Sequence, residues 1–233
     1  MKLMILFAGL LTLIAAFNSS PVFAAGMQGD VDQAATIISR FESMEENGIP
    51  PAIMRDAKGL AVLTVIKAGF IFSGRGGKGV VIARTGRGWS GPSAIGTGGV
   101  GFGPQIGVNS TEFLMVLNTD EAVRAFSQGG NLTLGAGVSV AAGPVGRTAE
   151  AGVTPFAAVY TYSRSQGLFI GASLEGTVLA ARDNANTEYY GGPVSPQQIL
   201  AGRVKPPAGA RSLENVLASA DARYCGRGKL ACR

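Results

Sequence analysis

The spacing of apolar residues changes along the chain, from a helical period near the start to short alternating runs in the middle. Between Asp30 and Asn47, apolar side chains recur at helical spacing, which predicts an amphipathic helix. Gly48 and the two prolines after it end this helix, and a second short helix is predicted from the prolines to Lys58 and Gly59. Further short helices are predicted at 120–127, 184–190, 195–201 and 211–220.

The middle of the chain has the pattern of successive strands. Short β-branched and aromatic runs are divided by glycine between Leu60 and Leu117, and again between Asn131 and Ala181. Because no regular alternation of strands and helices is present, a doubly wound parallel sheet is not expected. We predict an α+β fold, with an antiparallel β-barrel or strongly curved sheet as its core and several helices packed on its surface.

Glycine also produces a misleading motif. The stretch Gly74-Arg-Gly76-Gly-Lys-Gly79 satisfies the dinucleotide pattern G-x-G-x-x-G. That pattern binds a pyrophosphate only where a helix N-terminus follows it. Here the β-branched run starting at Val80 follows, which predicts a strand. We therefore interpret the stretch as a hairpin turn.

Composition excludes most familiar enzyme chemistry. Of 233 residues, 46% are hydrophobic and 15% are charged, so the chain can bury one sizeable core. It contains no histidine and two cysteines, which rules out Ser-His-Asp triads, HExxH zinc sites and iron–sulfur clusters. We predict that the protein is not an enzyme and has no catalytic residue, metal site or cofactor.

The first 24 residues have the layout of a secretory signal. Lys2 precedes an apolar run that ends at Phe17, and small residues stand before Ala25. An apolar run from Leu3 to Phe17 is too short to span a bilayer as a helix, which takes about 20 residues. The prediction is an exported protein, periplasmic or extracellular, that can lie at a membrane surface.

This layout divides the chain into four successive parts: a signal peptide at 1–24, a spacer at 25–29, one folded domain at 30–220 and a tail at 221–233. In an oxidising compartment, Cys225 and Cys232 are expected to form a disulfide within the tail. A pair of free thiols is the alternative.

Positive charge is concentrated between Arg55 and Arg87, where seven cations and a single acidic residue give a net charge of +6. Cations beside glycine turns, with backbone N–H groups and apolar side chains close by, suit anionic lipid headgroups at a membrane surface. An ordinary solvated rim is the alternative. Nucleic acid is not expected, because no recognised nucleic-acid module is present. The candidate lipid-binding residues are Lys67, Arg75, Lys78, Arg84 and Arg87.

Eight segments in fixed order carry a family resemblance: 67–74, 77–84, 88–95, 103–107, 142–147, 162–176, 186–191 and 199–202. Together they resemble the SYLF domain family, lipid-binding modules that are also described as actin regulators in fungi. The resemblance covers roughly Asp30 to Leu217. It implies a barrel-like β core with surface helices, binding of phosphoinositides or other anionic lipids, and no catalytic role.

The predicted function is therefore a non-catalytic module that recognises anionic lipid headgroups at a membrane surface. The alternative is a structural or protein-interaction module of the cell envelope without a physiological lipid ligand. Actin is not expected as a partner, because the chain is predicted to be exported.

Overall fold

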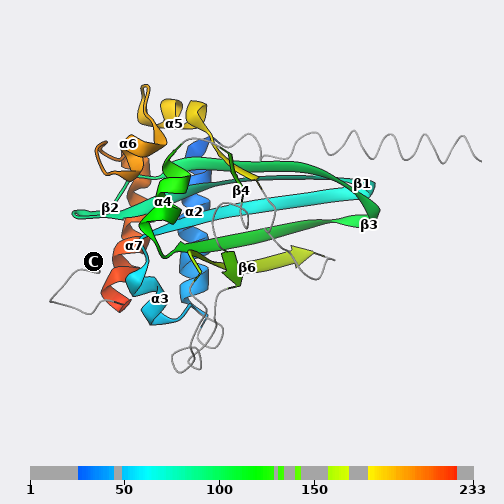
Figure 1. The fold of residues 1–233 in the computed structure, drawn as a ribbon, viewed down its shortest axis with the longest axis horizontal. Coiled ribbons are helices and arrows are strands. Elements are labelled where there is room, and N and C mark those ends of the chain that lie inside the picture. The colour runs from blue at the N-terminus through cyan, green and yellow to red at the C-terminus, as the bar shows by residue number, and fades with distance from the viewer. Residues whose placement is uncertain are drawn as a thin grey trace, which may run out of the picture.

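A computed structural model describes residues 26–44, 49–128, 131–133, 140–142, 157–167 and 178–224 of the chain (Figure 1). The segment predicted as a secretory signal lies outside the described residues. So do Cys225 and Cys232, and the predicted disulfide stays a prediction.

Two long strands form the centre of the fold. β1 (Gly59–Thr85) and β3 (Ser93–Leu117) pair antiparallel along almost their whole length, with a shift in register between Phe70 and Phe72. Figure 1 shows both strands running together away from the helices and then turning back. The central sheet is therefore strongly bent.

β1 returns alongside its own first half. The backbone N–H of Arg84 donates to the carbonyl oxygen of Lys58 at 2.8 Å. A Cβ atom on Gly79 would lie 1.9 Å from the carbonyl oxygen of Val62 and 2.5 Å from the Cα of Leu63. Glycine is required at position 79 because any larger residue would collide with this backbone.

The predicted hairpin turn at 74–79 is therefore wrong. These residues lie inside β1 and pair with β3, from Gly74 opposite Val100 to Gly79 opposite Ile95. Glycine serves here to bring two segments of backbone close together, and the chain does not reverse at this stretch.

Five shorter strands complete the sheet: β2 (Gly88–Trp89), β4 (Asn131–Thr133), β5 (Val140–Ala142), β6 (Val159–Gly167) and β7 (Val178–Ala181). β2 pairs with the end of β1, whereas β6 and β7 pair with opposite ends of β3. β4 joins β7, and β5 joins β6 in the one parallel pairing among the described strands. Within the described residues the sheet is not closed on itself. The α+β antiparallel prediction is confirmed, and the closed barrel is not.

The helices surround one end of the sheet: α2 (Met27–Glu42), α3 (Pro51–Asp56), α4 (Asp120–Ser127), α5 (Asp183–Tyr190), α6 (Pro196–Leu200), the short 3₁₀ helix η2 (Ala208–Ala210) and α7 (Arg211–Tyr224). α2 begins before Asp30, so part of the predicted spacer is helical. α7 likewise continues into the predicted tail.

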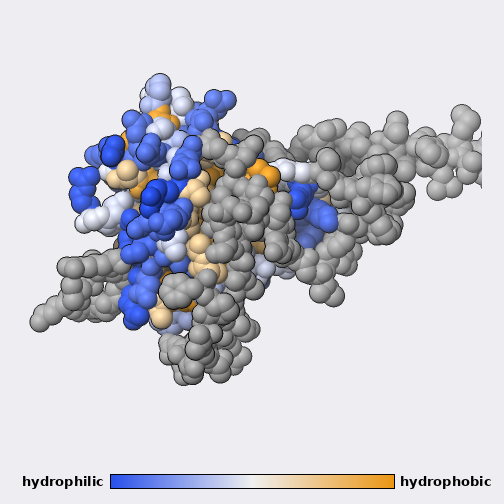
Figure 2. Space-filling view, viewed as in Figure 1, coloured by the Kyte–Doolittle hydropathy of each residue, from blue (hydrophilic) through white to orange (hydrophobic). Residues whose placement is uncertain are grey.

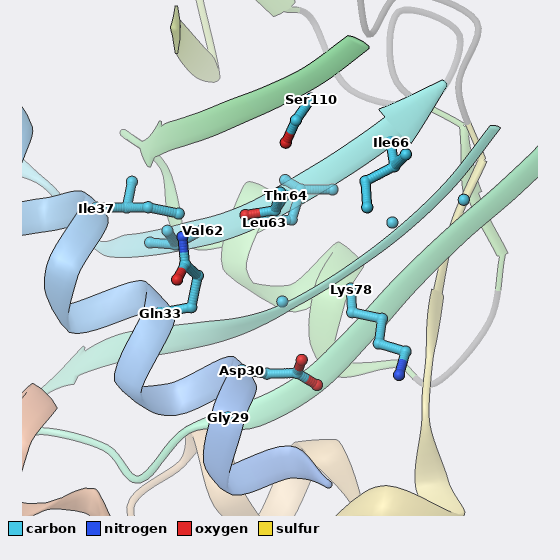
Figure 3. A pocket seen from close by; sticks show the side chains of 13 residues that line it. Gly29, Asp30, Gln33, Ile37, Val62, Leu63, Thr64, Ile66, Lys78 and Ser110 are labelled. Carbon is cyan, nitrogen blue, oxygen red and sulfur yellow. The ribbon is translucent and has the colours of Figure 1, made fainter. Parts of the chain in front are cut away.

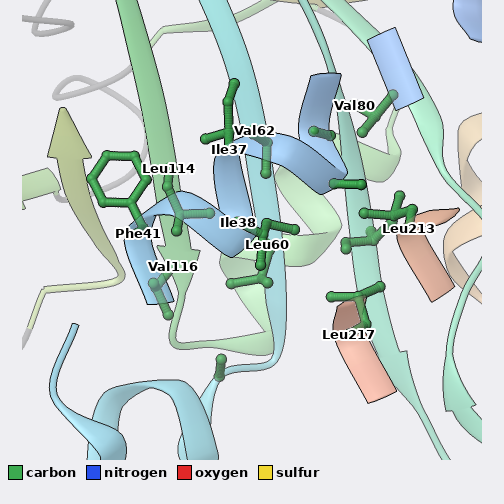
Figure 4. Packing of buried hydrophobic residues seen from close by; sticks show 14 of the residues in the cluster. Ile37, Ile38, Phe41, Leu60, Val62, Val80, Leu114, Val116, Leu213 and Leu217 are labelled. Carbon is green, nitrogen blue, oxygen red and sulfur yellow. The ribbon is translucent and has the colours of Figure 1, made fainter. Parts of the chain in front are cut away.

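Both faces of the sheet are buried at this end. Alternate residues of β1 point to opposite faces, as a strand requires. Leu60 and Val62 pack against α2 and α7 in one cluster, whereas Ala61 and Leu63 pack against α4 and α6 in the other. Figure 4 shows the first cluster, in which Ile38 of α2 lies close to the sheet. The two clusters fix the helices against β1 and β3.

Candidate functional site

The five predicted lipid-binding cations do not gather at one place. Arg75 is exposed and lies in the part of β1 that returns from the bend, whereas Arg87 lies in the turn between β1 and β2. Ten strand positions separate Arg75 from the end of β1 at Thr85, which corresponds to about 33 Å. Lys67 and Lys78 are half-buried and lie nearer to Arg75 in the sequence. The cations therefore belong to separate parts of the surface.

The side chain of Arg84 is buried and contacts other parts of the protein. Its side chain is 7% exposed and forms an ion pair with Asp221 of α7 at 2.9 Å. The same guanidinium donates to the carbonyl oxygen of Ala57 at 3.1 Å and lies 4.2 Å from the centre of the Trp89 ring. The indole N–H of Trp89 also donates to Asp221, at 2.9 Å. These contacts join α7 to the sheet and leave little of Arg84 for a ligand.

A recess that we call the basic hollow lies between β2 and the segment after α6. Its volume is about 370 Å³, and it is lined by Thr85, Arg87, Trp89, Ser90, Gly91, Gly202, Arg203, Val204, Lys205 and Pro206. Three lining residues are exposed cations, namely Arg87, Arg203 and Lys205, and none of the ten is acidic. The hollow therefore favours an anion.

Sequence reasoning identifies only one of these three cations. Arg87 belongs to the basic stretch that ends β1, but Arg203 and Lys205 lie far along the chain. In the fold they lie close together, and Arg87 Nη2 donates to the carbonyl oxygen of Gly202, next to Arg203, at 3.0 Å. The run Arg-Val-Lys-Pro-Pro from Arg203 is the available signal, but its sequence position does not connect it with Arg87.

A second cavity, the α2 cleft, lies between α2 and β1 (Figure 3). Its volume is about 330 Å³, and Ile37, Val62 and Ile66 give it apolar walls. Asp30 of α2 and Lys78 of β1 lie near each other on one side of the cleft, as Figure 3 shows. Lys78 is thus the one predicted lipid-binding residue that lines this cavity.

Polar groups at the α2 cleft are only partly paired. The hydroxyl of Thr64 is buried and has no hydrogen-bond partner among the described residues. The side-chain amide of Gln33 donates to Glu112 Oε1 at 3.4 Å, and Arg40 forms an ion pair with the same carboxylate. An unpaired buried hydroxyl costs stability unless water or a ligand satisfies it.

Asp30 is held by a partner from another part of the chain. Its Oδ2 accepts from Arg182 Nη1 at 2.5 Å, which ties α2 to the residue before α5. Burial raises the pKa of Asp30, and the nearby Arg182 and Lys78 oppose this shift. Gly26 is the N-cap of α2, so the helix begins before the predicted start at Asp30.

Two negative findings concern only the described part of the chain. No three His, Cys, Asp or Glu side chains there come together as ligands for a metal ion. No helix there is long and apolar enough to cross a membrane.

Comparison with known protein families shows to which family the chain belongs. Residues 98–220, more than half of the chain, match the family model Ysc84, described as "Las17-binding protein actin regulator". The chain belongs to the Ysc84 (SYLF) family. The predicted resemblance is confirmed, and the family is described by actin regulation and not by an enzymatic activity.

Known proteins of this family resemble the chain over most of its length. Protein YSC84 from Saccharomyces cerevisiae (strain ATCC 204508 / S288c) is 50% identical over 203 residues, which covers 83% of this chain and 43% of that protein. LAS seventeen-binding protein 3 from the same yeast strain is 44% identical, with 83% and 44% covered. SH3 domain-containing YSC84-like protein 1 from Homo sapiens is 43% identical over 213 residues, with 88% and 62% covered. This Ysc84-family chain spans about half the length of such relatives.

These matches correct two predictions. The prediction of a secretory signal and of an exported, periplasmic or extracellular protein is contradicted, because the family and its members are named for actin regulation, LAS seventeen binding and SH3 domains. The prediction that actin is not a partner rested on export, and the same names contradict it. The lipid-binding residues are not tested by these matches and stay a prediction.

Proposed function

We propose that this Ysc84-family domain is a non-catalytic protein-interaction module that works in actin regulation. The observation that carries this proposal is the family match over residues 98–220, with its description as a Las17-binding actin regulator. It favours the interaction-module alternative over lipid recognition as the main function.

The arrangement of the fold supports a role in binding. The helical end has a rigid, doubly covered core, so the surface around it can present side chains in fixed positions. Figure 2 shows hydrophilic side chains gathered over this end of the molecule. The basic hollow lies at the same end, beside β2 and α6.

Co-sedimentation with actin filaments tests the proposal. The purified chain is mixed with increasing filament concentrations and centrifuged, with an unrelated protein of similar charge as the control. The expected result is saturable pelleting of the chain with filaments that the control does not show. Recovery of the whole chain in the supernatant at every filament concentration contradicts direct actin binding, and binding to Las17 is then the remaining form of the proposal to be tested by pull-down.

Anionic lipid is a second candidate ligand. Arg75 favours it, because this cation is exposed and lies in the middle of β1. Lys67 and Lys78 belong to the same candidate set, with Arg87 at the other end of β1; the burial of Arg84 assigns it a structural role. Each cation near an anionic surface contributes about 1 kcal/mol.

Vesicle flotation tests this second candidate. Reversal of two cations, Arg75→Glu with Lys78→Glu, is expected to weaken binding to anionic vesicles by more than tenfold, which follows from the loss of about 1 kcal/mol per cation and the added repulsion. Arg55→Glu with Arg124→Glu, at two exposed arginines of α3 and α4, changes the net charge equally and is the matched control. Equal flotation of parent and double variant excludes this surface.

A further inference from the structure

Hydrogen bonds fix the backbone and the side chain that position the three cations of the basic hollow. The segment that bears Arg203 and Lys205 follows Gly202, whose φ of +66° lies in the left-handed region. The backbone N–H of Arg203 donates to the carbonyl oxygen of Gln198 at 3.0 Å, and that of Gly202 donates to Ile199 at 2.9 Å. On the other side, Arg87 is held by its bond to Gly202. The hollow is therefore formed before any ligand binds, which lowers the entropy cost of binding.

Apolar side chains lie beside the charges. Trp89 lines the hollow together with Pro206 and Val204. The indole is oriented by its hydrogen bond to Asp221 and by the guanidinium of Arg84 over its ring. The carboxylate of Asp221 is thus engaged by Arg84 and the indole, and it does not line the hollow. A ligand with both apolar and anionic groups matches this combination.

The shape of the site favours a peptide over a lipid surface. A flat membrane surface makes its best contacts with protruding cations, whereas this site is a recess with aromatic and proline walls. Acidic side chains of an extended peptide can reach Arg87, Arg203 and Lys205 while its apolar atoms contact Trp89. Arginine also binds carboxylates through paired N–H groups.

We propose that the basic hollow binds an acidic segment, rich in Asp and Glu, of a partner protein. The proposal rests on the proposed function as a protein-interaction module and adds the chemistry that the partner must present. Arg87, Arg203 and Lys205 bind the carboxylates, and Trp89 supplies the apolar contact.

A tryptophan in the basic hollow allows ligand binding to be followed by fluorescence. Trp89 is the one tryptophan of the chain, so tryptophan emission reports on the hollow. We would titrate the full chain with a hexaglutamate peptide at low salt and follow this emission. A saturable change is expected, and the apparent affinity should fall as salt is raised, because the interaction is between solvent-exposed charges.

Two double variants separate the hollow from general charge. Arg203→Glu with Lys205→Glu is expected to weaken peptide binding by more than tenfold. Arg55→Glu with Arg124→Glu changes the net charge equally at two exposed arginines of α3 and α4, and is expected to bind within twofold of the parent. Circular dichroism establishes that each variant is folded. Since all four side chains lie on the surface, these substitutions leave the core intact.

Three outcomes overturn the proposal: no saturable change in the parent, equal weakening by both double variants, or competition by inorganic phosphate or anionic vesicles at the same charge concentration as the peptide. The last outcome assigns the hollow to phosphate or lipid headgroups. Filament co-sedimentation is measured separately. A chain that binds the peptide through the hollow but neither filaments nor Las17 retains this inference and loses the proposed function.

Discussion

Arg84 and Arg87 stand three positions apart in one basic stretch, yet the structure gives them different surroundings. Arg84 is nearly buried between Trp89, Asp221 and the carbonyl of Ala57. Arg87 is exposed at the rim of the basic hollow. An arginine with three simultaneous partners contributes mainly to stability, whereas an exposed one is available to a ligand.

The substitution Arg84→Ala is therefore expected to destabilise the protein. It removes a charge-assisted pair and leaves Asp221 without its cation, which should lower the free energy of unfolding by about 2–3 kcal/mol. Urea unfolding followed by Trp89 emission measures the change. Arg55→Ala, at an exposed pair with Asp56, is the matched control and should change stability by less than about 0.5 kcal/mol. Equal effects of the two substitutions would show that the Arg84 contacts carry no special weight.

A substitution at Thr64 is expected to increase the stability of the fold, in contrast to Arg84→Ala. The buried hydroxyl of Thr64 has no hydrogen-bond partner in the part of the chain that the structure describes, so Thr64→Val should raise the free energy of unfolding by about 1 kcal/mol. Thr111, also buried on this sheet, shares a hydrogen bond with Ser165 at 3.0 Å, and Thr111→Val should lower stability by about 1 kcal/mol. Thermal or urea unfolding of both variants measures the pair. A loss of stability in Thr64→Val would indicate that the hydroxyl has a partner in solution.

Only some residues of the candidate sites can be predicted from the sequence. The basic stretch around Arg75 and Arg87 is visible from charge alone. The contribution of Arg203 and Lys205 is not, because it depends on the fold bringing the segment after α6 against the β1–β2 turn. Burial of Arg84 likewise follows from the position of α7, which charge patterning does not contain.

Among the elements, β1 requires glycine at a specific position. Its two halves approach so closely that a side chain at Gly79 would collide with the backbone of Val62 and Leu63. Gly79→Ala should therefore lower the free energy of unfolding by more than about 4 kcal/mol or prevent folding. Gly74, in the same strand, has open space around its Cβ position, and Gly74→Ala should cost less than about 1 kcal/mol. Circular dichroism and urea unfolding of the two variants decide the point. Similar behaviour of both would refute the close approach.

The contact between α2 and α7 predicts a dependence on pH. Burial raises the pKa of Glu42, the nearby Arg223 opposes this, and Asp221 adds to it. A carboxyl whose pKa is higher in the folded state stabilises the fold while protonated, and this contribution is lost as the pH rises through the folded pKa. Glu42→Gln cannot ionise, so its stability relative to the parent should increase from about pH 4.5 to pH 7. Urea unfolding at the two pH values measures this gap, and a constant or shrinking gap would contradict the assignment.

Most helices are predictable from apolar spacing, because an amphipathic stripe such as that of α2 reports directly on the face that packs. The strands are predictable in kind but not in length. The sequence predicts a strand end at each glycine, whereas β1 and β3 continue through their glycines and use them for close packing. The periodicity of a sequence indicates the face of each residue, but not the point at which a long strand bends.

For the whole molecule, the family relationship and the fold are both consistent with the proposed protein-interaction module. A bent antiparallel sheet with helices on both faces of one end supports a polar surface and the basic hollow. The chain spans about half the length of relatives named for SH3 domains and LAS seventeen binding, so it corresponds to part of larger proteins.

The proposed preference of this domain for protein partners over membrane can be measured in one density gradient. The chain is mixed with actin filaments and anionic vesicles together, then centrifuged so that filaments sediment and vesicles float. We expect the chain to be recovered mainly with the filaments, and its filament-bound fraction to fall as salt rises. Recovery of the chain mainly with the floating vesicles, while the filaments sediment without it, would contradict the claim.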